Sequence, residues 1–194
     1  MARPREFDID QALDNAMAVF WAKGYEGSSL ADLLDAMGIA RGSLYKAFKD
    51  KHAIYLAALD RYDRTMVEAA VVLLREPSGG DGLERIRGLL EAARDGAGER
   101  QHPRGCLMCN AAIDRATDDP AVRAQVLAMM KRLEDAFAVA LADSATARAW
   151  PNKRRSEAAR FLAGAYLGIQ VLVRAGYSAD ELDGVIAATL QALG

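Results

Sequence analysis

Cysteine and histidine are both scarce in this sequence. The 194 residues include two cysteines, Cys106 and Cys109, and two histidines, His52 and His102. Two cysteines are too few for the disulfide framework of a small secreted domain, and structural zinc sites usually need four ligands. We also find no glycine-rich cofactor loop, no Ser-His-Asp set and no paired carboxylates. These absences argue against an enzyme and predict neither a metal nor a cofactor.

A strong net charge and a long apolar run are missing as well. The formal net charge is −2, so any contact with nucleic acid has to use a local basic patch. The most apolar run, residues 161–173, is too short to span a bilayer. The charged start, MARPREFDID, has no apolar segment of the kind found in secretory signals. We therefore expect a cytoplasmic protein without a membrane partner.

Helical periodicity is present in nearly every segment. Apolar residues recur at spacings of three and four, and no strand-like alternation extends beyond a few residues. Gly24, Gly38 and the stretches at 76–82 and 150–154 interrupt the pattern, whereas it runs unbroken from Asp50 to Leu73. The pattern predicts an all-α protein of about nine helices. We expect a three-helix DNA-binding domain at 1–50 and a helical domain for ligand binding and dimerisation at 51–194.

Residues 28–48 have the pattern of a helix-turn-helix unit. Ser28 or Ser29 can cap a first short helix, which Gly38 ends, and a second short helix runs from about Ala40 to Phe48. Two short helices joined by a glycine-containing turn are typical of this DNA-binding unit, whose second helix enters the major groove.

The second of these helices carries side chains that suit DNA. Small residues at its front allow the backbone to approach the groove, and Arg41 can make two hydrogen bonds to a guanine edge. Tyr45 and Lys46 suit phosphates, and Lys51 can hold the DNA backbone from the start of the next helix. Residues 1–51 hold seven cations and eight acids, yet four of the cations lie within residues 41–51. Charge alone would indicate only a solvated face; the order of cap, turn and small-residue helix favours DNA binding.

The stretch GYEGSSLADLLDAMGIARGSLYKAFKDKHAIY, residues 24–55, resembles the head of the TetR/AcrR family of transcriptional repressors. The resemblance implies a homodimer that binds a palindromic double-stranded DNA operator and leaves it when a small molecule binds the C-terminal domain. By position it implies DNA contacts at Ser28, Leu30, Ala40, Arg41, Gly42, Ser43, Tyr45, Lys46 and Lys51. Lys46 and Ala47 depart from the family pattern, in which an aromatic residue and a histidine often occupy these places.

The C-terminal half predicts a dimer interface and an effector pocket. Small residues in the eighth and ninth expected helices would let two subunits approach closely. We expect the interface at Phe161, Gly164, Ala165, Gly168, Leu182, Ile186 and Leu190. An effector cavity among the fifth to eighth helices would be lined by Met108, Asn110, Met129, Met130, Leu133, Phe137, Tyr166 and Gln170. For every one of these residues the alternative is ordinary core packing.

Cys106 and Cys109 form a lone C-x-x-C pair with four possible roles. As a zinc site the pair lacks a second C-x-x-C, and His102 could add a third ligand at most. Arg104 and a helix N-terminus next to Cys106 would lower its pKa, so that Cys106 could sense oxidants or electrophiles. Some members of the resembled family have a cysteine in this region. The alternatives are a buried structural cysteine or, for the whole protein, a thiol–disulfide redox function using both residues.

Overall fold

The computed structural model describes residues 8–96 and 105–194. Every regular element in these two ranges is helical. In chain order they are α1 (Ile9–Lys23), α2 (Leu30–Met37), α3 (Arg41–Ala47), α4 (Lys51–Tyr62), η1 (Asp63–Val67), α5 (Glu68–Arg75), η2 (Pro77–Gly79), α6 (Gly82–Asp95), α7 (Leu107–Asp114), α8 (Pro120–Asp143), α9 (Asn152–Ala175) and α10 (Ala179–Gln191). Since α4, η1 and α5 form one continuous helix, the described part of the chain confirms the predicted all-α fold. None of the helices in these ranges is long and apolar enough to cross a membrane.

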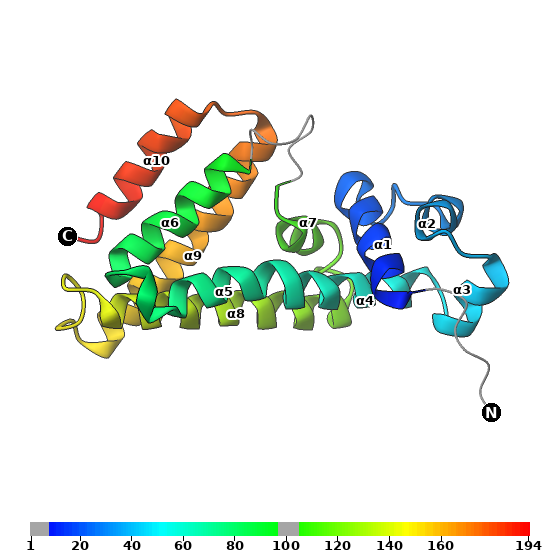
Figure 1. Cartoon of the computed structure of the whole chain (residues 1–194), viewed down its shortest axis with the longest axis horizontal. Helices are drawn as coiled ribbons and strands as arrows, with labels where there is room; N and C mark the ends of the chain where they lie inside the picture. The colour runs from blue at the N-terminus through cyan, green and yellow to red at the C-terminus, as the bar shows by residue number, and fades with distance from the viewer. Residues whose placement is uncertain (1–7, 97–104) are drawn as a thin grey trace.

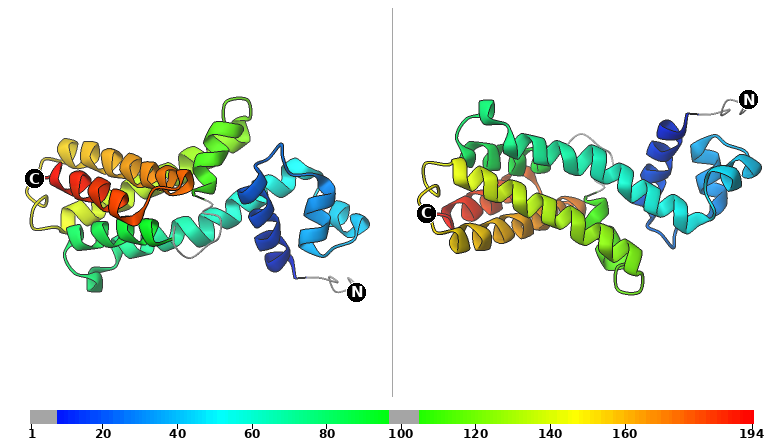
Figure 2. Two further views of the ribbon diagram at one scale, coloured as in Figure 1. Left: turned by 90° about the horizontal axis from the view of Figure 1, so that it is seen from above. Right: turned by 90° about the horizontal axis from the view of Figure 1, so that it is seen from below.

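Helices α1, α2 and α3 form a head at one end of the molecule (Figure 1). The long helix 51–75 and helix α8 run alongside each other away from this head, and α6, α9 and α10 pack at the far end (Figure 2). Helix α7 lies between, in contact with α1, α4 and α8. We call residues 8–50 the head and the described residues from Lys51 onward the body.

Local capping explains where the head helices begin and end. Ser29 caps α2, because its hydroxyl accepts from the backbone N–H of Asp32 and its own N–H donates to the Asp32 carboxylate. The hydroxyl of Ser28 instead donates to the carbonyl of Gly24 at 2.6 Å. Gly24 and Gly38 have φ values of 71° and 65°, which glycine adopts without steric cost, and they end α1 and α2.

The long helix contains a π-helical turn at Asp63–Val67 that periodicity did not predict. Arg132 of α8 forms ion pairs with Asp63, the first residue of this turn, and with Glu68, the residue that follows it. Burial raises the pKa of Asp63 above its ordinary value, although Arg132 opposes the shift. Such turns are often found at functional sites. Here the turn places Met66 at the wall of a pocket described below.

Apolar residues of the head and the body share one core. Phe20 of α1 is fully buried and meets Tyr55 of α4 edge to face, with ring centroids 4.9 Å apart. Leu33 and Leu44, the inward residues of α2 and α3, are also fully buried. Helix α3 is therefore fixed to a core that continues into the long helix.

Candidate nucleic-acid interface and ligand pocket

Helix α3 presents small, aromatic and cationic residues on its outer face. Arg41, Gly42 and Lys46 are exposed, and Tyr45 is 50% exposed despite its large ring. Leu44, on the opposite face of the helix, is fully buried and fixes its orientation. Helix α3 itself lies at the head end of the molecule, away from α6, α9 and α10 (Figure 1). Arg41 and Lys46 therefore project from a rigid helix toward open space.

The other residues expected at DNA differ in accessibility. Ala40 is exposed, Ser43 is half-buried, and Leu30 is half-buried against the apolar core. Ser28 is only 1% exposed, and its hydroxyl is occupied by the carbonyl of Gly24. The prediction of a DNA contact by the Ser28 side chain is therefore wrong, because this short polar group completes the turn after α1 instead.

Lys51, at the first position of α4, lies over the ring of Tyr25. Its Nζ atom is 4.3 Å from the ring centroid, and the guanidinium carbon of Arg115 is 4.6 Å from the same centroid. Both distances are within the range of cation–π attraction. A single ring thus contacts a candidate phosphate-binding lysine and an arginine at the end of α7. No sequence pattern predicted this cluster, since Tyr25 and Arg115 are far apart in the chain.

The start of α4 is also tied to the start of α8. The Nε2 atom of His52 lies 2.7 Å from Oδ2 of Asp119, the N-cap residue of α8. The Asp119 carboxylate also accepts from the backbone N–H groups of Ala121 and Val122. Burial tends to raise the pKa of Asp119, but the Val122 N–H and His52 outweigh it, so that the pKa lies below its ordinary value.

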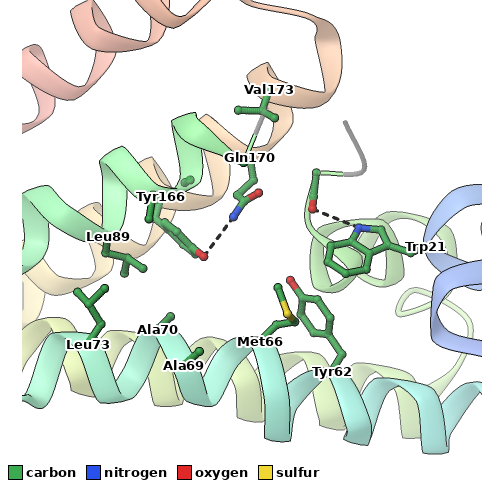
Figure 3. Close-up of a pocket in the computed structure, with 14 residues that line it drawn as sticks. Trp21, Tyr62, Met66, Ala69, Ala70, Leu73, Leu89, Tyr166, Gln170 and Val173 are labelled. Carbon is green, nitrogen blue, oxygen red and sulfur yellow. Dashed lines mark hydrogen bonds between the residues drawn. The ribbon is translucent and has the colours of Figure 1, made fainter. Parts of the chain in front are cut away.

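A pocket with a volume of about 260 Å³ lies where the head meets the body (Figure 3). We call it the inter-domain pocket, and helices α1, α4, α5, α6 and α9 with turn η1 supply most of its wall. Its lining residues are Trp21, Tyr62, Met66, Ala69, Ala70, Leu73, Leu89, Ala92, Ala93, Gly96, Gly105, Tyr166, Gln170 and Val173. Of the residues expected at an effector cavity, Tyr166 and Gln170 are present.

Most of the other expected pocket residues belong to the core. Met108, Met129, Leu133 and Phe137 are at most 1% exposed, Met130 is half-buried against the core, and none of the five lines the inter-domain pocket. The prediction was wrong for these residues because helical periodicity identifies an apolar stripe without showing whether it meets a helix or a cavity.

Hydrogen bonds organise the polar part of the inter-domain pocket. The indole Nε1 of Trp21 donates to the carbonyl of Gly105 at 3.2 Å, and its ring meets that of Tyr62 edge to face, with centroids 5.2 Å apart. The Nε2 atom of Gln170 donates to the Tyr166 hydroxyl oxygen at 3.1 Å (Figure 3). Burial raises the pKa of Tyr166 to about 12, so this phenol stays protonated at neutral pH.

Cys106 and Cys109 border a second pocket, which we call the thiol pocket. It has a volume of about 430 Å³ and is lined by Ala22, Lys23, Gly24, Cys106, Cys109, Asn110, Ile113, Asp114, Gln170, Val171 and Arg174. Asn110, expected at an effector cavity, therefore lies here. Unlike the inter-domain pocket, the thiol pocket has charged side chains of both signs in its wall.

Cys106 occupies the N-cap position of α7, with both described cysteines unpaired. Hydrogen bonds from the Cys109 thiol, the Tyr62 hydroxyl and the Cys109 N–H lower its pKa, although burial opposes them. The pKa of Cys109 is raised, and the largest cause is its thiol hydrogen bond to Cys106.

Within residues 8–96 and 105–194, no three His, Cys, Asp or Glu side chains gather as metal ligands. His102 and Arg104 lie outside the described residues. Cys106 is only 3% exposed, and it lies in the wall of the thiol pocket.

Helix α9 has an exposed stripe of small and apolar residues. Phe161 is 48% exposed and Val171 is 50% exposed, and Gly164 and Gly168 lie between them. A Cβ atom added at either glycine would have no neighbour within 4 Å. The stripe is therefore open and flat enough for a second helix to approach closely.

Two residues expected at the dimer interface point inward instead. Leu182 is fully buried and Ile186 is 3% exposed, because α10 packs this face against α6 and α9 of the same chain. Ala165 and Leu190 are half-buried. The prediction was wrong for Leu182 and Ile186 because it chose the larger apolar side chains of α10, and those form the core.

A helix-turn-helix head with an outward-facing second helix, joined to a helical body that encloses pockets, defines a DNA-binding regulator with a ligand-binding domain. A family profile described as bacterial regulatory proteins of the tetR family matches residues 12–58. A second profile, described as the tetracyclin repressor-like C-terminal domain, matches residues 82–189. The chain belongs to the TetR family of bacterial transcriptional regulators.

Individual relatives agree with this assignment. The chain is 35% identical over 137 residues to YezE of Bacillus subtilis, an uncharacterised HTH-type transcriptional regulator, covering 71% of this chain and 70% of that one. It is 38% identical over 109 residues to the Escherichia coli repressor ComR, but spans only 51% of ComR. The solved structure of a CifR cysteine mutant, a TetR family regulator complexed with 26bp operator DNA, is similar with a TM-score of 0.84 and 31% identity, covering 98% of this chain and 99% of that one.

Proposed function

We propose that this protein is a homodimeric repressor that binds a palindromic operator in the cytoplasm and has no enzymatic activity. The observation that carries this proposal is the outer face of α3, where Arg41, Tyr45 and Lys46 project from a helix that Leu44 fixes to the core. The similarity to CifR, whose structure is complexed with operator DNA, and to the repressor ComR supports it.

In this proposal residues 1–50 bind DNA and residues 51–194 bind the effector and the second subunit. Arg41 reads a base edge in the major groove, and Tyr45, Lys46 and Lys51 contact phosphates, with Ala40, Gly42 and Ser43 allowing close approach of the backbone. The exposed stripe of α9, with Phe161 and Val171, meets its copy in the partner subunit. Twofold symmetry then requires half-sites separated by about one helical turn of DNA, ~34–36 Å, or a multiple of it.

A gel-shift assay with the DNA upstream of the protein's own gene tests this proposal. Arg41→Ala should weaken specific binding by about 1–3 kcal/mol per half-site, and Lys46→Ala should weaken binding to all sequences alike. Lys153→Ala, an exposed cation on α9 far from the head, serves as the matched control and should bind like the parent protein. Unchanged binding by a folded Arg41→Ala variant would contradict the assignment of α3.

We propose two routes of release from the operator, namely a small molecule in a body pocket and modification of the Cys106 thiol. The second route is supported by the hydrogen bonds that lower the pKa of Cys106 and by its place in the wall of the thiol pocket. Cys106→Ser should keep operator binding and lose release by peroxide or an aldehyde, whereas Cys109→Ser should keep both. If Cys106→Ser responds as well as the parent protein, the thiol route is refuted.

A further inference from the structure

The described lining residues of the inter-domain pocket include no Asp, Glu, Lys, Arg or His. Four alanines, two glycines and several larger apolar side chains make up most of the wall. A ligand that brought a net charge into this space would lose its hydration without gaining an opposite charge, at a cost of several kcal/mol. The part of the wall that the structure describes therefore favours an uncharged molecule with mainly apolar surface.

The Tyr166–Gln170 pair leaves hydrogen-bond donors for a ligand in this pocket. The Tyr62 hydroxyl donates to Sγ of Cys106 at 3.4 Å, and the Trp21 indole donates to the carbonyl of Gly105. Tyr166 accepts from Gln170, which leaves its own proton for another acceptor. The second N–H of the Gln170 amide is left over as well. If the amide is turned over, Tyr166 donates to its oxygen and both amide N–H groups remain, so the pair offers donors to a ligand in either arrangement. A ligand with a carbonyl or ether oxygen would accept from one of these donors.

The wall also includes a side chain of the head. Trp21, from α1, is the one residue of the head that lines this pocket, and it is only 6% exposed. Its hydrogen bond to Gly105 and its contact with Tyr62 join the head to the body at this point (Figure 3). A molecule in the pocket would therefore lie directly against the side chain that holds α1 to the body.

We propose that the inter-domain pocket binds an uncharged, mainly apolar small molecule that carries a hydrogen-bond acceptor, which pairs with the Tyr166–Gln170 donor next to Trp21. This inference rests on the proposed function only in that it names the effector class of the regulator. Binding to the pocket and binding to DNA are measured separately, so failure of one is distinguishable from failure of the other.

Four probes with the same two-ring skeleton test the ligand class by equilibrium dialysis. They are methyl naphthyl ketone, ethylnaphthalene, naphthoate and naphthylmethylammonium, which differ in charge and in the presence of an acceptor. The ketone should bind at least ~10-fold more tightly than either ion, because neither charge finds a partner in the wall. Equal or tighter binding of naphthoate or of the ammonium compound, or no binding of the ketone, would overturn the proposal.

Substitutions locate the ligand and identify the donor. A double substitution, Tyr166→Phe with Gln170→Leu, should weaken ketone binding by about five- to tenfold, the effect of one lost hydrogen bond, and leave ethylnaphthalene unchanged. Ala92→Trp, at an exposed position of the wall, should block both probes without disturbing the fold. Ketone affinity that either variant leaves intact contradicts the assignment.

Tryptophan emission gives a second readout of the same site. The chain has two tryptophans, so Trp150→Phe leaves Trp21 as the only one. Because aryl ketones quench indole emission at contact, the ketone should quench Trp21 with the same dissociation constant found by dialysis. Ketone binding without quenching would place the ligand elsewhere and overturn the proposal, while operator binding by the same variant reports independently on the proposed function.

Discussion

The contact between Tyr25 and Lys51 predicts how strongly an aromatic ring can support DNA binding. Lys51 Nζ lies 4.3 Å from the Tyr25 ring centroid, a geometry worth about 0.5–1 kcal/mol at an exposed site. If the ring holds Lys51 in place for a phosphate, Tyr25→Leu should cost this amount in each subunit. A dimer would then lose ~1–2 kcal/mol, which weakens operator binding about 5- to 30-fold.

Fluorescence anisotropy with labelled operator DNA, measured over a range of salt concentrations, is the assay. The binding constant K falls as salt rises, and each phosphate contact contributes about −0.9 to the slope of log K against log salt concentration. Loss of Lys51 from both subunits, in Lys51→Ala, should therefore make this slope less steep by ~2. Tyr25→Leu should also weaken operator binding and make this slope less steep, as Lys51→Ala does. Tyr25→Phe keeps the ring and should behave like the parent protein, which separates the aromatic contact from the phenol hydroxyl.

The combination Tyr25→Leu with Lys51→Ala gives the decisive result. Tyr25 also packs beside Tyr55, with ring centroids 4.9 Å apart, so the thermal midpoint of each variant has to be measured alongside. If the ring acts through Lys51, the double variant binds DNA no more weakly than Lys51→Ala alone. Additive losses in the double variant, or a Tyr25→Phe variant as weak as Tyr25→Leu, would refute the reasoning.

Two further predictions concern stability. A Cβ atom on Gly82 would lie 1.7 Å from the carbonyl oxygen of Ala140, so Gly82→Ala should force α6 away from α8. The free energy of unfolding, measured in urea, should fall by ~3 kcal/mol. Gly88 has open space around it, so the control Gly88→Ala should be neutral or slightly stabilising. Asp119 has a lowered pKa in the folded state, so its contribution is present above the unfolded value of about 4 and is lost as the pH falls. Asp119→Asn should therefore be ~1 kcal/mol less stable than the parent at pH 7, and a difference that persists undiminished at pH 3 would contradict this assignment.

The fold of the head could be predicted from the sequence because its signals are local. Gly24 and Gly38 end helices with positive φ, and Leu44 appears at the inward position that helical spacing assigns to it. The π-helical turn at Asp63–Val67 could not be predicted in the same way. It is accompanied by ion pairs with Arg132, which lies more than 60 residues further along the chain.

The pockets could be predicted only in part. Tyr166 and Gln170, two of the residues predicted to line an effector cavity, do line the inter-domain pocket. Trp21 and Tyr62 were missed because their spacing is that of core residues, and only the meeting of α1 with the long helix turns them into a pocket wall. A cavity is the space that packing leaves unfilled, and the pattern of one helix contains no information about the shape of its neighbours.

Helix α7 connects the candidate effector sites with the candidate DNA contacts. Its N-cap is Cys106, which lines the thiol pocket and follows Gly105 of the inter-domain pocket, and Arg115, its C-cap residue, lies over the Tyr25 ring. Its eight helical residues span about 12 Å, and i→i−4 backbone hydrogen bonds join its first turn to its last. A displacement of its first turn, by a ligand or by a group added to Cys106, would therefore move Arg115 relative to Tyr25. Because Lys51 lies over the same ring, both routes of release would reach DNA through one element, and Tyr25→Leu should weaken both together.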